Sequence, residues 1–154
     1  MHQLANLFIM MVVFIVAQPS LAQESRRIDI VPPSMEVLNE RYHYSPAVRV
    51  GNLLFVAGQV GRNENLEVVV GKEEQLVQAF ENLKTVLSEV GADFDDVVEI
   101  VTYHTSMEDL PLVLEVKDRY FKNRFPAWTA LEVKGLSMPE LDFEIKATAH
   151  LSYE

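Results

Sequence analysis

The chain has 154 residues, a length typical of a single domain. Hydrophobic residues make up 49% of the chain and charged residues 23%, a globular composition that is too apolar for intrinsic disorder. The formal net charge of -10 argues against nucleic acid and anionic lipid as partners, because a surface of this sign repels both. The chain has no cysteine, which excludes disulfides, thiolate catalysis and cysteine-ligated metal sites.

Residues 1–22 have the pattern of a signal peptide. No charged side chain precedes Glu24, and residues 7–17 form an unbroken apolar run that is shorter than the ~20 residues of a membrane span. We therefore expect cleavage after Ala22, a single mature domain of residues 23–154, a periplasmic or secreted protein, and no stable membrane insertion. An uncleaved signal anchor is the alternative, because no Lys or Arg precedes the apolar run.

The first half of the mature chain predicts a hairpin followed by a helix. Residues 24–41 carry two prolines and no clear period, which indicates an extended lead-in. From Ala47 onward, two β-rich runs flank Gly51 and Asn52, a hairpin signal. Residues 73–90 form the clearest helix, because apolar residues recur every three or four positions.

The second half predicts three more strands and a second helix. Residues 97–104 are rich in β-branched side chains, and Ser106 is a candidate N-cap for a helix that runs to about Asn123. Residues 128–133 and 142–153 are predicted strands, the last with alternating apolar and polar side chains. This order predicts an α+β domain in which two helices cover one face of a mixed sheet.

The opposite face of the predicted sheet needs a second covering. Val48, Val50 and residues 53–56 bring more apolar surface than one face can bury. We therefore expect a symmetric homo-oligomer in which sheet faces pack together.

Common metal and catalytic motifs are absent from the sequence. His43, His104 and His150 are far apart and do not have the spacing of metal ligands. The chain contains neither a phosphate-binding glycine loop nor a nucleophile elbow around a serine. We expect no metal and no cofactor.

Four polar or aromatic residues on strands and turns remain as candidates for ligand binding: Tyr44, Gln59, Trp128 and Glu144. Each also has a purely structural explanation. Trp128 and Tyr44 can be packing residues, Gln59 a turn residue bonded to nearby backbone, and Glu144 a solvated strand residue. Composition and periodicity leave these alternatives open.

These positions lie in phrases that together resemble the RidA family, also called the YjgF or Rid family. The phrases are Tyr44-Ser45-Pro46-Ala47, GNLLFVAGQ at residues 51–59, the helix at residues 75–91, FPA at residues 125–127, Glu132-Val133, and EIKA at residues 144–147. The resemblance covers residues 34–151. It implies a chorismate-mutase-like α+β fold and a homotrimer with small-molecule clefts between subunits.

The resemblance also implies an activity. Active members of the family hydrolyse enamines and imines, such as 2-aminoacrylate, to keto acids and ammonia. In them an Arg after the Pro-Ala pair grips the substrate carboxylate, a Tyr lines the cleft, and a late Glu helps to position water. Glu144 matches that Glu and is the candidate catalytic residue. The candidate substrate-binding residues are Tyr44, Ala57, Gly58 and Trp128, of which Ala57 stands where the family usually has Ser.

Trp128 stands where the family has its carboxylate-binding arginine. A guanidinium makes two charge-assisted hydrogen bonds to a carboxylate, whereas an indole has a single neutral donor. Each charged hydrogen bond contributes about 1.5 to 3 kcal/mol, so carboxylate binding is expected to weaken roughly tenfold to a thousandfold unless Arg49, Arg62 or Arg124 compensates. Ordinary 2-aminoacrylate deamination is therefore disfavoured.

Two functions of different classes follow as hypotheses. In the first, the protein is a hydrolase of another imine or enamine, with Glu144 positioning water and Trp128 shaping the pocket. In the second, it is a non-catalytic trimer that binds a small metabolite by stacking on Trp128, a role that export from the cytoplasm favours. The endoribonuclease activity attached to the family is a third hypothesis, which the net charge of -10 opposes.

Overall fold

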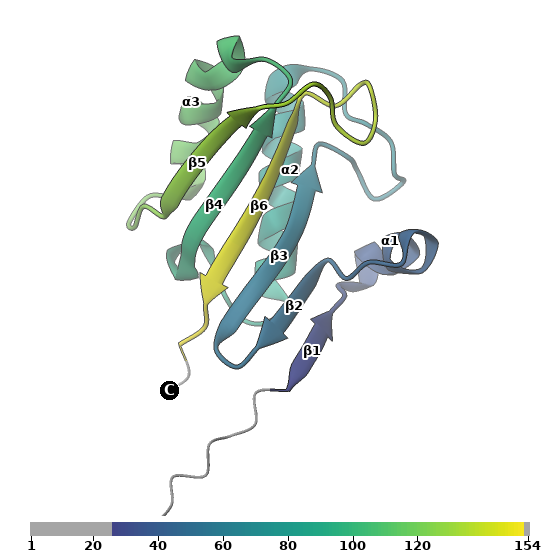
Figure 1. Ribbon diagram of the computed structural model, residues 1–154, viewed down its shortest axis with the longest axis vertical. Helices are drawn as coiled ribbons and strands as arrows, with labels where there is room; N and C mark the ends of the chain where they lie inside the picture. The colour runs from purple at the N-terminus through teal and green to yellow at the C-terminus, as the bar shows by residue number, and fades with distance from the viewer. Residues whose placement is uncertain (1–25, 153–154) are drawn as a thin grey trace, which may run out of the picture.

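The computed structural model describes residues 26–152, which form one six-stranded sheet with helices against it (Figure 1). The predicted signal peptide lies outside the described residues. In chain order the elements are β1 (Arg27–Ile30), the 3-10 turn η1 (Pro33–Met35), α1 (Glu36–Tyr42), β2 (Ala47–Val50), β3 (Leu53–Val60), α2 (Lys72–Ser88), η2 (Phe94–Asp96), β4 (Val97–His104), η3 (Met107–Asp109), α3 (Leu110–Tyr120), β5 (Ala127–Glu132) and β6 (Phe143–His150).

The sheet is mixed, as the sequence predicts. Its strand order is β1-β2-β3-β6-β4-β5. The pairing of β4 with β5 is parallel, and the other neighbouring pairs are antiparallel. The hairpin between β2 and β3 turns at Gly51, whose φ of 60° is a left-handed conformation that favours glycine. The α+β prediction is confirmed.

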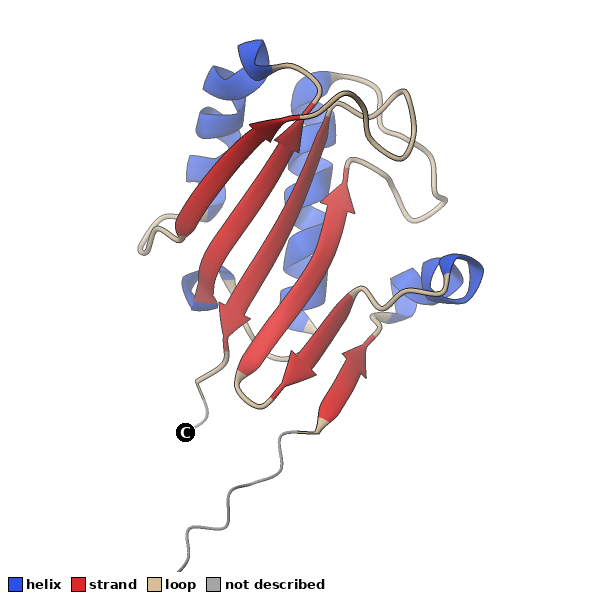
Figure 2. Cartoon of the chain, in the orientation of Figure 1, coloured by secondary structure: helices blue, strands red, loops and turns tan. Residues whose placement is uncertain are grey.

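Two helices, α2 and α3, cover one face of the sheet (Figure 2). The predicted apolar stripe of α2 is buried, with Leu76, Phe80, Leu83 and Leu87 all at 2% exposure or less. The ring of Tyr120, at the end of α3, stacks on Phe80 with centroids 4.8 Å apart. These contacts place the hydrophobic core between the two helices and the sheet.

The extended lead-in predicted for residues 24–41 is wrong in its second half. The segment contains β1 at the edge of the sheet, but it then forms η1 and the short helix α1. Helix α1 has seven residues and ends at His43, which has a left-handed φ of 55°. Among these seven only Leu38 is buried, so the helix is too short to repeat an apolar period, and the sequence pattern gives no sign of it.

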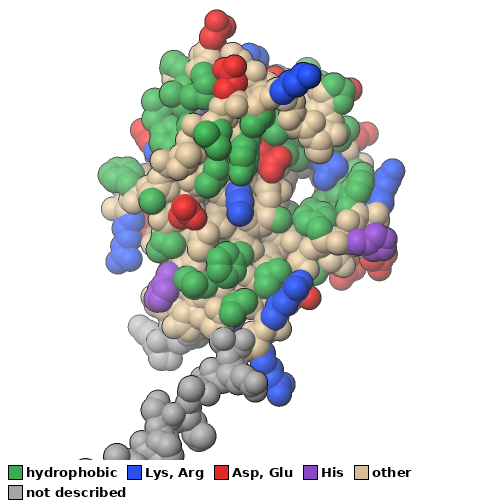
Figure 3. All heavy atoms as spheres, in the orientation of Figure 1, with side chains coloured by type: hydrophobic (Ala, Val, Ile, Leu, Met, Phe, Trp, Pro, Cys, Tyr) green, Lys and Arg blue, Asp and Glu red, His purple; other side chains and the backbone are tan. Residues whose placement is uncertain are grey.

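The second face of the sheet carries exposed hydrophobic side chains. Leu53, Phe55 and Leu131 point away from the helices and are 39%, 43% and 45% exposed. Figure 3 views this face and shows hydrophobic side chains spread across the strands with few charges among them. Within residues 26–152, no helix is both long enough and apolar enough to cross a membrane.

Candidate functional site

The candidate site lies where a bulge interrupts β3. The register between β3 and β6 shifts between Val56 and Gln59, so that β3 carries one residue more than its partner. Gln59 pairs with Ile145 and is buried on the helix side, whereas Gly58 lies against Glu144 on the opposite face. Bulges of this kind re-aim side chains and are common beside active sites.

Glu144 lies over Gly58. Its position near the start of β6 places it beside Val60 on one neighbouring strand and Tyr103 on the other. A Cβ added at Gly58 would overlap the Glu144 carboxyl group, so a larger residue there would displace this group from its present position. Burial raises the pKa of this half-buried carboxyl group. A raised pKa brings a carboxyl group closer to the range in which it can both accept and return a proton near neutral pH.

Tyr44 and Glu144 face a common pocket of about 240 Å³. Its lining residues are Tyr42, Tyr44, Gly58, Val60, Arg62, Ser137, Met138 and Glu144. Burial raises the pKa of Tyr44, the positive charge of Arg62 opposes that rise, and the negative charge of Glu144 adds to it. The carboxyl group and the guanidinium are therefore both close enough to the Tyr44 phenol to affect its pKa.

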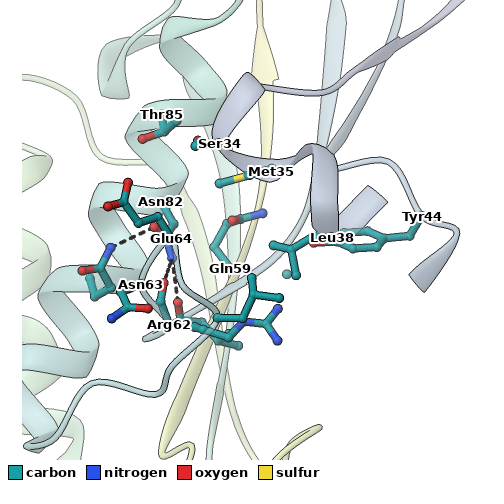
Figure 4. A pocket seen from close by; sticks show the side chains of 14 residues that line it. Ser34, Met35, Leu38, Tyr44, Gln59, Arg62, Asn63, Glu64, Asn82 and Thr85 are labelled. Carbon is teal, nitrogen blue, oxygen red and sulfur yellow. Dashed lines mark hydrogen bonds between the residues drawn. The ribbon is translucent and has the colours of Figure 1, made fainter. Parts of the chain in front are cut away.

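A larger pocket of about 390 Å³ adjoins the first, between the segment that contains α1 and the outer turns of α2 (Figure 4). The residues lining it are Ser34, Met35, Leu38, Tyr44, Gly58, Gln59, Val60, Arg62, Asn63, Glu64, Leu66, Gln78, Asn82 and Thr85. Tyr44, Gly58, Val60 and Arg62 line both pockets. Figure 3 shows the molecule hollowed at this place, between the end of β3 and α1.

Asn82 of α2 fixes the loop that follows β3. Its Nδ2 donates to the backbone oxygens of Val60 and Arg62, both at 2.9 Å, and its Oδ1 accepts from Gln78 Nε2 at 2.9 Å (Figure 4). The backbone N–H of Arg62 donates to the Val60 oxygen at 2.8 Å. The backbone that carries Arg62 is thus held against a helix that is itself part of the core.

Trp128 lies elsewhere, on edge strand β5. Its indole N–H donates to Thr102 Oγ1 at 2.9 Å, and the same hydroxyl group lies 2.8 Å from His104 Nε2. The Lys117 ammonium group lies 5.4 Å from the centre of a Trp128 ring. Burial lowers the pKa of His104, which favours the neutral form of the ring. In the single chain, Trp128 therefore packs against the helix side of the sheet.

The structure brings together three of the five predicted site residues and separates the other two from them. Tyr44, Gly58 and Glu144 line the smaller pocket. Trp128 and Ala57 line neither of the two pockets described above. Ala57 is engaged in backbone hydrogen bonds, donating to the Pro46 oxygen at 2.9 Å and accepting from Gln59 Nε2 at 3.1 Å. The ligand-binding roles of all five residues stay predictions.

Sequence reasoning missed four residues of the smaller pocket. One is Val60, at the end of β3, and the other three are Tyr42, Ser137 and Met138. Tyr42 ends the unpredicted helix α1, and Ser137 and Met138 belong to the connection between β5 and β6. None of the three lies in a motif or a periodic pattern. Arg62, one of three arginines that the sequence leaves open as a compensating cation, is the only one of them that lines either pocket.

No group of metal ligands forms in the part of the chain that the structure describes. His104 is buried beside Thr102, His43 is the C-cap that follows α1, and His150 is exposed at the end of β6. The histidines thus have separate structural positions.

Comparison with known proteins places this geometry in a family. The family model described as Endoribonuclease L-PSP matches residues 36–151. The chain belongs to this family. Its members also carry the names RutC, YjgF and RidA. The match contains α1, the whole lining of the smaller pocket, most of the lining of the larger one and all five predicted site residues.

Similar relatives cover most of the domain. The RutC family protein YjgH of Escherichia coli (strain K12) is 35% identical over 127 residues, which are 81% of this chain and 95% of the relative. A solved structure of a protein named YjgH has a TM-score of 0.76 and covers 83% of this chain and 98% of its own. The human 2-iminobutanoate/2-iminopropanoate deaminase is 34% identical over 95 residues, which are 60% of this chain and 69% of the relative. The predicted family and fold are confirmed.

Proposed function

We propose that this protein hydrolyses a small imine or enamine, releasing ammonia and a carbonyl compound. The observation that carries the proposal is the Glu144 carboxyl group, which is half-buried over Gly58 in one pocket with Tyr44 and has a raised pKa. Family members named 2-iminobutanoate/2-iminopropanoate deaminase support the reaction type. Because Trp128 stands where the family resemblance places an arginine, we do not expect 2-aminoacrylate to be the preferred substrate unless another cation binds its carboxylate.

The reaction needs one proton acceptor that can return its proton. Ionised Glu144 accepts a proton from water while the water oxygen bonds to the carbon of the protonated imine, which gives a neutral carbinolamine. The Glu144 carboxyl group then donates this proton to the nitrogen. The carbon–nitrogen bond breaks, ammonia leaves, and the hydroxyl proton returns to the Glu144 carboxylate as the carbonyl forms. The Tyr44 hydroxyl group, in the same pocket, is placed to hydrogen-bond the substrate. An enamine enters the same sequence after protonation at carbon gives the imine.

We also propose that the protein acts as a homotrimer with the site at a subunit interface. Leu53, Phe55 and Leu131 support this, because they expose hydrophobic surface on the face that carries Glu144. Light scattering after size-exclusion chromatography should give three times the mass of one chain at micromolar concentration. A monomer mass under those conditions would contradict the trimer.

Binding of a metabolite by stacking on Trp128 has less support. The indole N–H is engaged with Thr102, and the Lys117 ammonium group lies near the ring. Neither of the two pockets includes Trp128. RNA cleavage, to which the family description refers, is opposed by the net charge of -10, because a polyanion needs clustered cations.

The test measures ammonia release from imines that an amino-acid oxidase generates in the same vessel. Glu144→Gln should lower kcat at least about 100-fold, since removing a general base typically costs 10²- to 10⁴-fold. The exposed Glu89→Gln, at the end of α2, is the matched control and should match wild type.

The pH profile provides a second readout. Glu144 must be ionised to accept a proton from water, and burial raises its pKa. Activity should therefore fall with decreasing pH through a midpoint above the ordinary glutamate range, and the Gln variant should lack this limb. Wild-type ammonia release at the rate of buffer alone, across a panel of imines, would refute the proposed reaction.

A further inference from the structure

Arg62 lies at the junction of the two pockets. It lines both of them, and in the smaller pocket it is accompanied by Tyr44 and Glu144. Its side chain is half-buried, and the guanidinium carbon lies 5.9 Å from the centre of the Tyr42 ring. Figure 4 shows the Arg62 guanidinium extending from the loop after β3 toward the space beneath Leu38.

The Arg62 guanidinium has no carboxylate partner within the described residues. No Asp or Glu oxygen among residues 26–152 forms an ion pair with it. Glu64 also lines the larger pocket, but it is exposed and does not pair with Arg62. By contrast, Arg119 contacts both Glu73 and Glu115, at 2.7 and 2.8 Å. A partly desolvated cation without an anion is unfavourable unless another group supplies the negative charge.

The surroundings make Arg62 suited to bind a ligand rather than to hold the fold together. Asn82 and the Val60 oxygen hold its backbone by hydrogen bonds, and its guanidinium group lies over the ring of Tyr42. A guanidinium against an aromatic ring keeps its N–H edges open for two parallel hydrogen bonds to a carboxylate. Of the three arginines that the sequence leaves open, Arg62 alone lines either of these two pockets.

We propose that Arg62, in the loop after β3 rather than on β5, binds the carboxylate of the substrate. The inference rests on the proposed hydrolysis for the reacting group. The anion-binding role of Arg62 is measured without turnover. In this arrangement the carboxylate meets Arg62 while the imine carbon lies toward Tyr44 and Glu144.

The experiment compares two probes, 2-oxobutanoate and butan-2-one, of which the second has a methyl group in place of the carboxylate. Binding to the full-length protein is followed by ligand-observed NMR titration. Arg62→Met should weaken 2-oxobutanoate binding roughly tenfold to a hundredfold, because hydrogen bonds to a charged group are lost, and should leave butan-2-one unchanged. Arg62→Lys keeps the charge without the two-pronged geometry and should restore part of the loss. Arg124→Met is the matched control, since Arg124 is exposed and lines neither pocket.

The binding measurements test the role of Arg62 independently of whether the proposed hydrolysis occurs. Equal binding of 2-oxobutanoate by wild type, Arg62→Met and Arg124→Met would overturn the inference, whether or not ammonia is released. Absence of 2-oxobutanoate binding to wild type would also overturn it. Arg62-dependent binding without ammonia release from any imine would keep the inference and refute the hydrolysis. Activity assays add a further readout, in which KM for an imino acid should rise in Arg62→Met with little change in kcat.

Discussion

Two regions of the sheet differ in how their polar groups are satisfied. At the junction of β4, β5 and α3, the Trp128 indole donates to Thr102 and the Thr102 hydroxyl bonds to His104. The nearby Lys117 ammonium group pairs with Asp118 at 2.8 Å. At the junction of β3 and β6, Arg62 has no ion-pair partner within residues 26–152, and Glu144 lies half-buried over a glycine beside a hollow.

We interpret this as the difference between a stabilising region and the proposed functional one. Hydrogen bonds that polar groups make within the chain add to stability, as those of Thr102 and His104 do. A buried or half-buried charge that the chain leaves uncompensated lowers stability, and such groups cluster where a ligand supplies the missing partner. Both regions contain residues that the sequence marks as candidates, and only the arrangement of their partners distinguishes them.

The largest effect on activity is expected from a substitution at the junction of β3 and β6, beside the smaller pocket. Gly58→Ala places a methyl group where the Glu144 carboxyl group lies, so the carboxyl group must move. A displacement of about 1 Å at a reacting group costs on the order of 100-fold in rate. We expect kcat for ammonia release to fall by about that factor, as measured in the coupled oxidase assay.

Gly135→Ala is the control for this substitution. A Cβ at Gly135 meets no atom within 4 Å, so the substitution changes only a surface loop and should leave activity unchanged. Circular dichroism of both variants verifies that each is folded. Wild-type activity in a folded Gly58→Ala would show that the position of the Glu144 carboxyl group is not needed for the reaction.

A smaller effect is expected from Trp128→Arg, which probes the packed region. The variant loses the hydrogen bond to Thr102 and part of the ring packing, and it adds a second cation near Lys117. We expect the free energy of unfolding in urea to fall by about 2 to 4 kcal/mol. Trp128→Phe keeps an aromatic ring and should lose only about 1 kcal/mol.

The Trp128→Arg variant also tests whether the two regions differ in role. If Trp128→Arg is as stable as wild type and gains tenfold or more in turnover of carboxylated imines, position 128 faces the ligand, and the packed arrangement does not describe the assembled protein. Adding Lys117→Met to Trp128→Arg should recover part of the lost stability, because it removes the like-charged neighbour. Without such recovery, repulsion between the two cations is not a cause of the instability.

Periodic segments were predictable and short or irregular ones were not. The apolar stripe of α2 and the alternation along β6 each bury one face, which is why Phe80 and Ile145 lie in the core as expected. Helix α1 has a single buried residue, Leu38, and therefore no period to detect. The bulge before Gln59 is also not detectable in the hydrophobic pattern of the sequence. A single inserted residue changes the alternation of apolar and polar side chains too little to be recognised.

The candidate site was predictable in part. Tyr44, Gly58 and Glu144 stand in motifs that resemble the family, and the structure brings them to one pocket. Trp128 stands in an equally clear motif, but in the single chain its side chain lies on the helix side of the sheet. The sequence names Arg62 only as one of three arginines, because which cation reaches a pocket depends on the path of the loop after β3.

The sequence by itself determined the α+β order, the faces of α2 and β6, and the family, because each depends on residue types at fixed spacings along the chain. Only the tertiary structure decided which candidates meet. Gly58 and Glu144 are far apart in the chain and touch because β3 and β6 are neighbours with a bulge between Val56 and Gln59. Contacts of this kind depend on strand order and register, which the pattern of residue types along the sequence does not specify.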